Sequence, residues 1–140
     1  NSENVVTFRL RNYEANFAGL QFCAEFLFQR DESQGKKLVG GNYSRSNYLD
    51  AFDPQSGMKR AIDDYNRLLA YLTEQYGTPW RSFIDIDGQS HVDVTDNIND
   101  FLELEAREAA AVWTVPVEGG SRPVLTLTLT SKGLLCIDYH

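Results

Sequence analysis

The stretch from Gly57 to Pro79 constrains the fold more than any other part of this chain. Its apolar residues recur at intervals of three and four, so they form one stripe along an otherwise charged helix. The residues of this stripe are Met58, Ala61, Ile62, Tyr65, Leu68, Leu69, Leu72 and Tyr76. A helix with one apolar face must bury that face against another element. We therefore predict one long helix, over about residues 57–76, packed on a sheet.

The ends of this helix are also marked in the sequence. Asp53 and Ser56 are competing candidates for the N-cap, and Pro54 suits the first helical position if Asp53 is the cap. Gly77 stands where a helix often ends on a residue with positive φ, and Pro79 prevents the helix from resuming.

Most of the remaining apolar residues alternate with polar ones, as is typical of half-buried strands. The predicted strands cover residues 4–11, 20–29, 37–45, 109–117, 124–130 and 134–139. The second and third strands form a hairpin around the polar turn 30–36, with a bulge at Gly40 and Gly41. The last three strands form a meander.

The segment 80–100 is the least regular and most acidic part of the chain. From Asp96 to Ala106 the residue preferences favour a short helix, although Leu102 and Leu104 alternate with glutamates and leave a strand as the alternative. The prediction is one α+β domain over residues 1–140. It has an antiparallel sheet of about five to six strands, the long helix and a second short helix over about 96–106.

Charge and composition exclude several classes of partner. The formal net charge is −7 at pH 7, without a basic block, so the surface repels nucleic acids and anionic lipid headgroups. No apolar run approaches the roughly 18 residues that span a bilayer. The chain begins at Asn1 rather than Met, so we expect a mature form from which a targeting segment has been removed.

An acidic cluster is the one candidate for a metal site, and the metal would be calcium. Its candidate ligands are Asp85, Asp87, Asp93 and Asp96. Asp-x-Asp-Gly is the middle of a calcium loop, but aligning Gly88 with the loop's glycine puts Phe83 and Val94 at two ligand positions. The alternative is a solvated loop whose aspartates cap turns. No other cofactor is expected.

The sequence contains no recognisable catalytic motif, so we expect no enzymatic activity. A small hydrolase that uses Asp85 and His91 is the alternative. Cys23 and Cys136 both lie on predicted strands, where they either form a disulfide or remain two unpaired thiols.

Four aromatic residues lie in or beside predicted connections. They are Tyr43, Tyr48, Phe52 and Trp80. Aromatic side chains in such places anchor protein partners or stack on sugars, and the alternative is that they seal the ends of the helix against the sheet.

The layout of the chain resembles small exported or lipid-anchored bacterial domains of unknown function. The likeness lies in the Phe-rich hairpin, the helix ending in YLTEQYGTP, the acidic stretch, Trp113 and the final strand at Tyr139. This resemblance implies an exported or envelope location and provides no catalytic residues. We expect a non-enzymatic domain that binds another protein through loops or a sheet edge, as an inhibitor or immunity protein does. The alternatives are a calcium-stabilised carbohydrate-binding or adhesion module and the small hydrolase.

Overall fold

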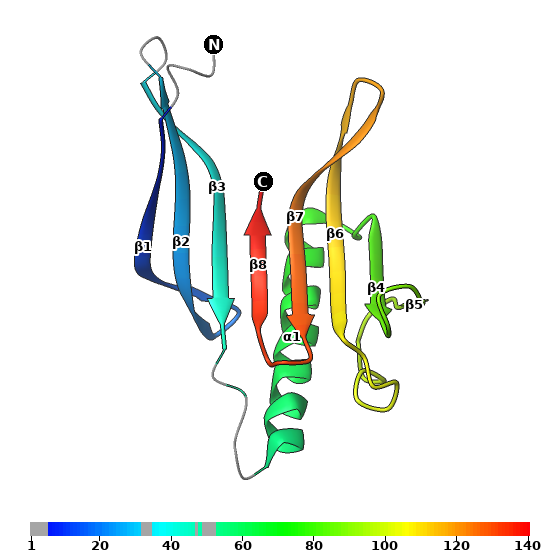
Figure 1. The fold of residues 1–140 in the computed structure, drawn as a ribbon. Coiled ribbons are helices and arrows are strands. Elements are labelled where there is room, and N and C mark those ends of the chain that lie inside the picture. The colour runs from blue at the N-terminus through cyan, green and yellow to red at the C-terminus, as the bar shows by residue number, and fades with distance from the viewer. Residues whose placement is uncertain (1–5, 32–34, 47, 49–52) are drawn as a thin grey trace.

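The described part of the chain folds into one antiparallel sheet of eight strands with a helix on one face (Figure 1). The computed structural model describes residues 6–31, 35–46, 48 and 53–140. In chain order the elements are β1 (Val6–Phe17), β2 (Leu20–Asp31), β3 (Gly35–Arg45), α1 (Pro54–Tyr76), β4 (Arg81–Asp85), β5 (His91–Asp93), β6 (Glu108–Val117), β7 (Gly120–Thr130) and β8 (Leu135–Tyr139). The order across the sheet is β1-β2-β3-β8-β7-β6-β4-β5.

The predicted α+β fold with five to six strands and a second helix is wrong. The described part of the chain is mostly β, with eight strands and one helix. The segment 96–106, predicted as a helix or a strand, is a run of turns instead. Phe101 donates to the Ile98 carbonyl and Ala106 to that of Phe101, so the hydrogen-bond spacing changes along the segment. Asn97 accepts from the Asn99 amide, because asparagine side chains compete with helical backbone bonds.

The acidic segment contains a hairpin that the prediction missed. β4 pairs with β5 and, on its other side, with β6. Ser82 and Ile84 are the two buried residues of β4, and all three residues of β5 are exposed. With only two residues facing the core, these strands show no clear alternation of apolar and polar residues in the sequence.

The ends of α1 confirm the predicted helix signals. Asp53 is the N-cap, and its side chain accepts a hydrogen bond from the Ser56 amide at 3.1 Å. The helix therefore begins at Pro54 rather than at about residue 57. At the other end Gly77 has a φ of 86°, and its amide donates to the Thr73 carbonyl at 2.8 Å.

The core lies between α1 and the middle of the sheet, where α1 packs against β7. Leu125, Leu127 and Leu129 are buried on the helix side, while Thr126 and Thr128 between them are half-buried. Because strand side chains alternate, these threonines lie on the opposite face, which we call the open face. Of the described elements, α1 covers only the helix side (Figure 1).

The predicted meander and first hairpin are confirmed by the strand pairing. β6, β7 and β8 are consecutive neighbours, and β2 pairs with β3. The predicted bulge lies one residue away from the glycine pair: Leu27 is opposite Gly40 and Phe28 is opposite Leu38, so Val39 is the additional residue. β8 then lies between β3 and β7, which brings the two predicted regions into one sheet.

Replacing Leu127 with Ala should lower the free energy of unfolding by about 2–5 kcal/mol, because it leaves a cavity under α1. Thr128→Ala, one residue away on the open face, should change it by less than about 1 kcal/mol. Urea unfolding of both variants measures the difference. Equal losses would contradict a sheet that is covered on one face.

Candidate functional site

Among the described strands, β8 is shorter than both of its neighbours, β3 and β7. The ladder between β3 and β8 runs from Arg45 opposite Leu135 to Gly41 opposite Tyr139. Within the described part of the chain, the rest of β3 towards Gly35 has no paired strand on this side. β3 and β7 diverge beyond the end of β8 (Figure 1). A stretch of β3 that no described strand pairs with on this side therefore lies inside the sheet order rather than at its border.

Two hollows meet at this edge from opposite faces of the sheet. Both are lined by the same five residues, which we call the notch: Val39, Gly40, Gly41, Tyr139 and His140. The hollow on the helix side has a volume of about 260 Å³, and the one on the open face about 370 Å³. The edge of β3 is therefore accessible from both sides.

Glycine at position 40 suits the close approach of β3 to the end of β8. A Cβ atom at Gly40 would lie 3.0 Å from the Tyr139 carbonyl oxygen. A side chain there would therefore require the Tyr139 carbonyl to move by a few tenths of an ångström. Glycine in a strand often marks a place where another backbone comes close.

The helix side of the notch has a floor of aromatic rings. The Tyr43 ring makes edge-on contacts with Phe17, Phe26 and Tyr139 at centroid distances of 4.7, 5.9 and 5.6 Å. Burial raises the pKa of the Tyr139 phenol, and a hydrogen bond with Tyr76 raises it further. Leu38 lines the same hollow and is 55 % exposed. These rings and Leu38 offer apolar contact area to a partner, and the contacts between the rings hold Tyr43 in place.

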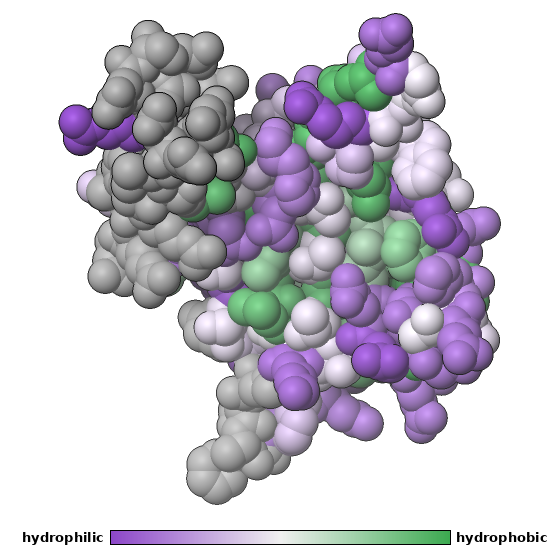
Figure 2. Space-filling view, turned by 45° about the horizontal axis from the view of Figure 1, so that its top comes forward, coloured by the Kyte–Doolittle hydropathy of each residue, from purple (hydrophilic) through white to green (hydrophobic). Residues whose placement is uncertain are grey.

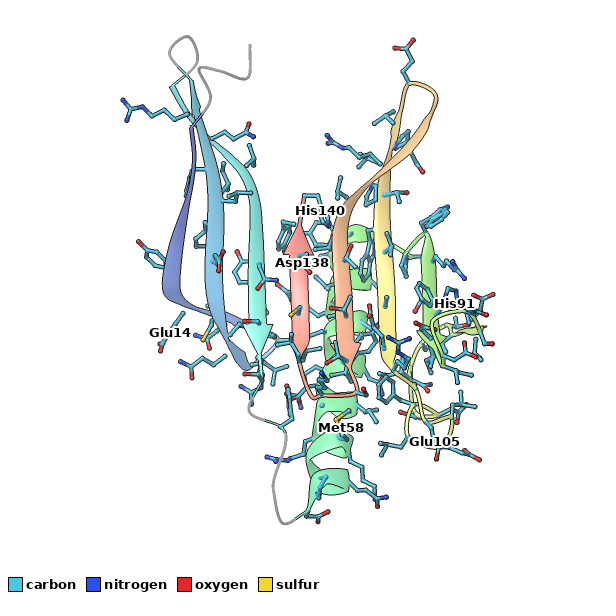
Figure 3. All side chains as sticks on the ribbon, in the orientation of Figure 1. Glu14, Met58, His91, Glu105, Asp138 and His140 are labelled. Atoms are coloured by element: carbon cyan, nitrogen blue, oxygen red, sulfur yellow. The ribbon has the colours of Figure 1, made fainter. Side chains whose placement is uncertain are left out.

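The open-face side of the notch is polar and acidic. Its hollow is also lined by Glu25, Leu27, Asn42 and Asp138. The Asn42 amide donates to Asp138 at 2.6 Å, which fixes the position of that carboxylate. Figure 3 shows Asp138 on β8 and His140 just after the end of that strand, with β3 on one side and β7 on the other. Figure 2 shows hydrophobic patches between hydrophilic residues on this side of the molecule.

The structure separates the four aromatic residues that the sequence singled out. Tyr43 lies in the notch wall, on a strand rather than in a connection. Tyr48 is buried and has a structural role: it donates to Asp64 at 2.6 Å and accepts from Arg45 at 2.8 Å. Trp80 is 66 % exposed and precedes β4, far along the sheet order from β3. Phe52 lies outside the described residues.

Two carboxylates of the acidic segment accept hydrogen bonds from backbone amides of the turn between β4 and β5. Asp85 accepts from the Gly88 amide at 2.8 Å. Asp87 accepts from the amides of Gln89 and Ser90, and these bonds lower the pKa of its carboxyl.

The remaining candidate ligands lie apart from these two. Asp93 faces Arg81 at 3.9 Å, and Asp96 is exposed in the turns that follow β5. Among the described residues, no group of three or more His, Cys, Asp or Glu side chains is arranged to hold a metal ion.

His91 lies beside Asp85, as the hydrolase alternative requires, but its Nδ1 is engaged by Arg81. Nδ1 lies 3.0 Å from the Arg81 guanidinium, which can only donate, and Nε2 lies 3.7 Å from the Asp85 carboxylate. The ring also stacks on Phe83 at 4.7 Å. The lone pair of Nδ1 accepts from Arg81, so it is engaged by a cation rather than directed at solvent. This arrangement does not favour proton transfer.

Cys23 and Cys136 are free thiols, with β3 between them. Ser44 is opposite Cys23 on one side and opposite Cys136 on the other. Two strand spacings separate the cysteines by about 9–10 Å, more than the roughly 7 Å that a disulfide spans between Cα atoms. Burial, together with Asp138, raises the pKa of the Cys136 thiol. The structure does not bring these two residues together.

Comparison with known proteins offers no relative from which a function could be transferred. No protein-family model matches the chain, and neither curated proteins nor solved structures include a match. In the described ranges, no helix is both long enough and apolar enough to cross a membrane. The functional argument therefore depends on the geometry of the notch.

Tyr48→Phe should lower the free energy of unfolding by about 1–3 kcal/mol near pH 7, since Asp64 and Arg45 lose a buried partner. Burial, and the hydrogen bond to Asp64, raise the pKa of the Tyr48 phenol in the folded protein. Its contribution is therefore complete below the unfolded pKa of about 10 and is lost as the pH rises further.

The difference between the wild type and Tyr48→Phe should accordingly shrink above about pH 10. Urea unfolding over a series of pH values measures it, with Tyr13→Phe as a half-exposed control. A difference that stayed constant into alkaline pH would contradict the proposed role of the hydroxyl.

Proposed function

We propose that this chain is a non-enzymatic binding domain that holds another protein at the notch. The observation that supports it most strongly is the edge of β3 at Val39 and Gly40, with which no described strand pairs on this side and which hollows on both faces reach. Unpaired backbone N–H and C=O groups at strand spacing are a template for another polypeptide. Many domains bind extended segments by completing such an edge.

A protein suits this surface better than the other classes of ligand. The groups on offer at the edge are backbone donors and acceptors, which a second backbone matches at every other residue. A net charge of −7 opposes nucleic acids. The aromatic floor around Tyr43 adds rigid apolar contacts that lose little side-chain entropy on binding. Together these features provide both affinity and a fixed register.

The two alternatives from the sequence receive less support from the geometry. The hydrolase would need an accessible base, whereas His91 is held between Arg81 and Asp85. The calcium module would need converging carboxylates, whereas Asp85 and Asp87 accept bonds from the amides of their own turn. Neither arrangement provides a reason to prefer these functions over binding at the notch.

Selection of short peptides from a random display library on the immobilised protein tests this proposal. Leu38→Lys places a charge in the helix-side hollow, and Val92→Lys is the matched control because Val92 is also exposed but lies on β5. Selected peptides should bind wild type and Val92→Lys alike, and Leu38→Lys at least about tenfold more weakly. Failure to recover any peptide that depends on Leu38 would contradict the proposal.

A further inference from the structure

We infer that a hollow beside Trp80 binds a neutral sugar, whose ring stacks on the exposed indole. The hollow lies between residues 78–82 and residues 93–95 and has a volume of about 380 Å³. These residues belong to or flank β4 and β5, at the border of the sheet away from β3 (Figure 1). The Trp80 hollow is therefore a second binding site, and the inference does not rest on the proposed function.

Both walls of the Trp80 hollow are fixed by backbone hydrogen bonds. The Trp80 amide donates to the Val112 carbonyl at 2.8 Å, which ties the first wall to β6. The Val94 amide donates to the Ser82 carbonyl at 3.0 Å, which holds the second wall against the first. A site that is formed before its ligand arrives loses less free energy on binding.

Trp80 supplies a flat apolar surface at one side of the hollow. It is 66 % exposed, whereas Trp113, the other tryptophan of the chain, is buried. Tryptophan is highly buried on average, and its indole has few rotatable bonds to immobilise on binding. The C–H groups on one face of a sugar ring match such a surface, while the hydroxyl groups around the ring stay available for hydrogen bonds.

Arg81 and Asp93 provide a donor and an acceptor beside that surface. The Arg81 Nε lies 3.9 Å from the Asp93 carboxylate, and both side chains are accessible to solvent. A guanidinium only donates and a carboxylate only accepts, whereas each sugar hydroxyl does both. Two neighbouring hydroxyls can therefore accept from Arg81 and donate to Asp93 in charge-assisted bonds. Because the two opposite charges lie together, the hollow favours a neutral ligand.

The Arg81 guanidinium is held in position by two rings. It lies 3.0 Å from Nδ1 of His91, and its Cζ lies 4.4 Å from the centroid of the Phe83 ring. Figure 3 shows His91 at this border of the sheet. A donor in a fixed position selects ligands whose hydroxyl groups have a matching arrangement.

Ser82 lines the same hollow and has a buried hydroxyl group without a partner. The residue is 8 % exposed, and among the described residues nothing forms a hydrogen bond with its Oγ. Buried polar groups normally have such a partner. Side chains alternate along a strand, so Ser82 lies on the same face as Trp80, which immediately precedes β4. A sugar hydroxyl beside the indole suits this position.

Other classes of ligand suit the Trp80 hollow less well. A nucleotide also stacks on tryptophan, but the net charge of −7 opposes its phosphate groups. A cation over the indole would lie close to the Arg81 guanidinium. The volume of about 380 Å³ is near the lower end of the range for ligand pockets, roughly 300–1,000 Å³, which suits a mono- or disaccharide.

NMR titration of the intact chain with neutral mono- and disaccharides of glucose, galactose, mannose and N-acetylglucosamine tests this inference. The indole N–H signal of Trp80 is the one that Trp80→Phe lacks. At least one sugar should shift it saturably, with a Kd of about 1 mM or tighter, and leave the Trp113 signal unchanged. Because the ligand is neutral, the Kd should change less than about twofold between low and high salt. No saturable shift with any of these sugars would overturn the inference.

Variants of the two walls locate the bound sugar. Trp80→Ala should weaken its binding at least about tenfold, and Trp80→Phe, which keeps a flat ring, should weaken it less. Tyr13→Ala is the matched control, because Tyr13 is also an exposed aromatic residue but lies on β1. Asp93→Ala, at an exposed position where folding is not at risk, should weaken binding severalfold. Equal effects of Trp80→Ala and Tyr13→Ala would overturn the inference.

The outcomes distinguish this inference from the proposed function. Leu38→Lys changes the notch, so it should leave sugar binding unchanged. Loss of sugar binding in Leu38→Lys but not in Trp80→Ala would place the sugar in the notch and overturn the inference. Choline that shifted the Trp80 signal at lower concentration than every sugar would overturn it in favour of a cation site. Peptides selected on the protein that depended on Trp80 and displaced the sugar would overturn it in favour of a protein partner.

Discussion

The antiparallel ladder between β3 and β8 is the interaction on which the rest of the sheet depends. It joins β1, β2 and β3 to the strands that α1 covers. Side-chain hydrogen bonds at the Arg45 end of the ladder also join β3 to β2 and to α1. Arg45 donates to the Gln21 carbonyl and to Tyr48. Tyr48 in turn donates to Asp64 on α1. Over the described residues the ladder runs from Arg45 opposite Leu135 to Gly41 opposite Tyr139. This one ladder therefore determines the cohesion of the sheet, and the notch lies at its Gly41–Tyr139 end.

The two faces of the sheet have different roles because α1 covers one of them. On the helix side, the leucines of β7 are buried under α1, and Trp113 donates to the Gly77 carbonyl at 2.7 Å, which ties β6 to the end of the helix. On the open face, the threonines of β7 and Asp138 of β8 remain accessible to solvent. The hydrophobic effect thus concentrates stability on one side. The other side can present polar groups without loss of core packing.

Local patterns in the sequence predicted the features of the fold that depend on residues close together in the chain. Alternation identified the meander, and Asp53 with Gly77 marked the ends of the helix. The prediction failed where the signal is short or depends on tertiary contacts. β4 buries two residues, and Ile98 is placed by an Asn66 side chain that accepts a bond from its amide, 32 positions away in the chain. A run of turns that is fixed by such distant contacts has no regular spacing of apolar residues from which it could be predicted.

The notch could not be predicted, although the lengths of its strands were nearly correct. It exists because β3 and β8, about 90 residues apart in sequence, are neighbours, and local periodicity does not contain that pairing. Tyr43 was singled out as an aromatic residue near a connection, whereas its position comes from strand pairing with Ala24 and Ile137. The same pairing places β3 between Cys23 and Cys136. Strand order was the missing information in each case.

Residue-resolved amide hydrogen exchange of the free protein tests the central claim most directly. Exchange reports whether a backbone amide has a stable hydrogen-bond partner. If β3 is unpaired beyond Gly41, its β8-facing amides between Gly35 and Gly40 should exchange much faster than its β8-facing amides between Gly41 and Arg45. Equal protection along the whole of β3 would show that another segment already fills the notch, and would contradict a site that is open to a partner strand.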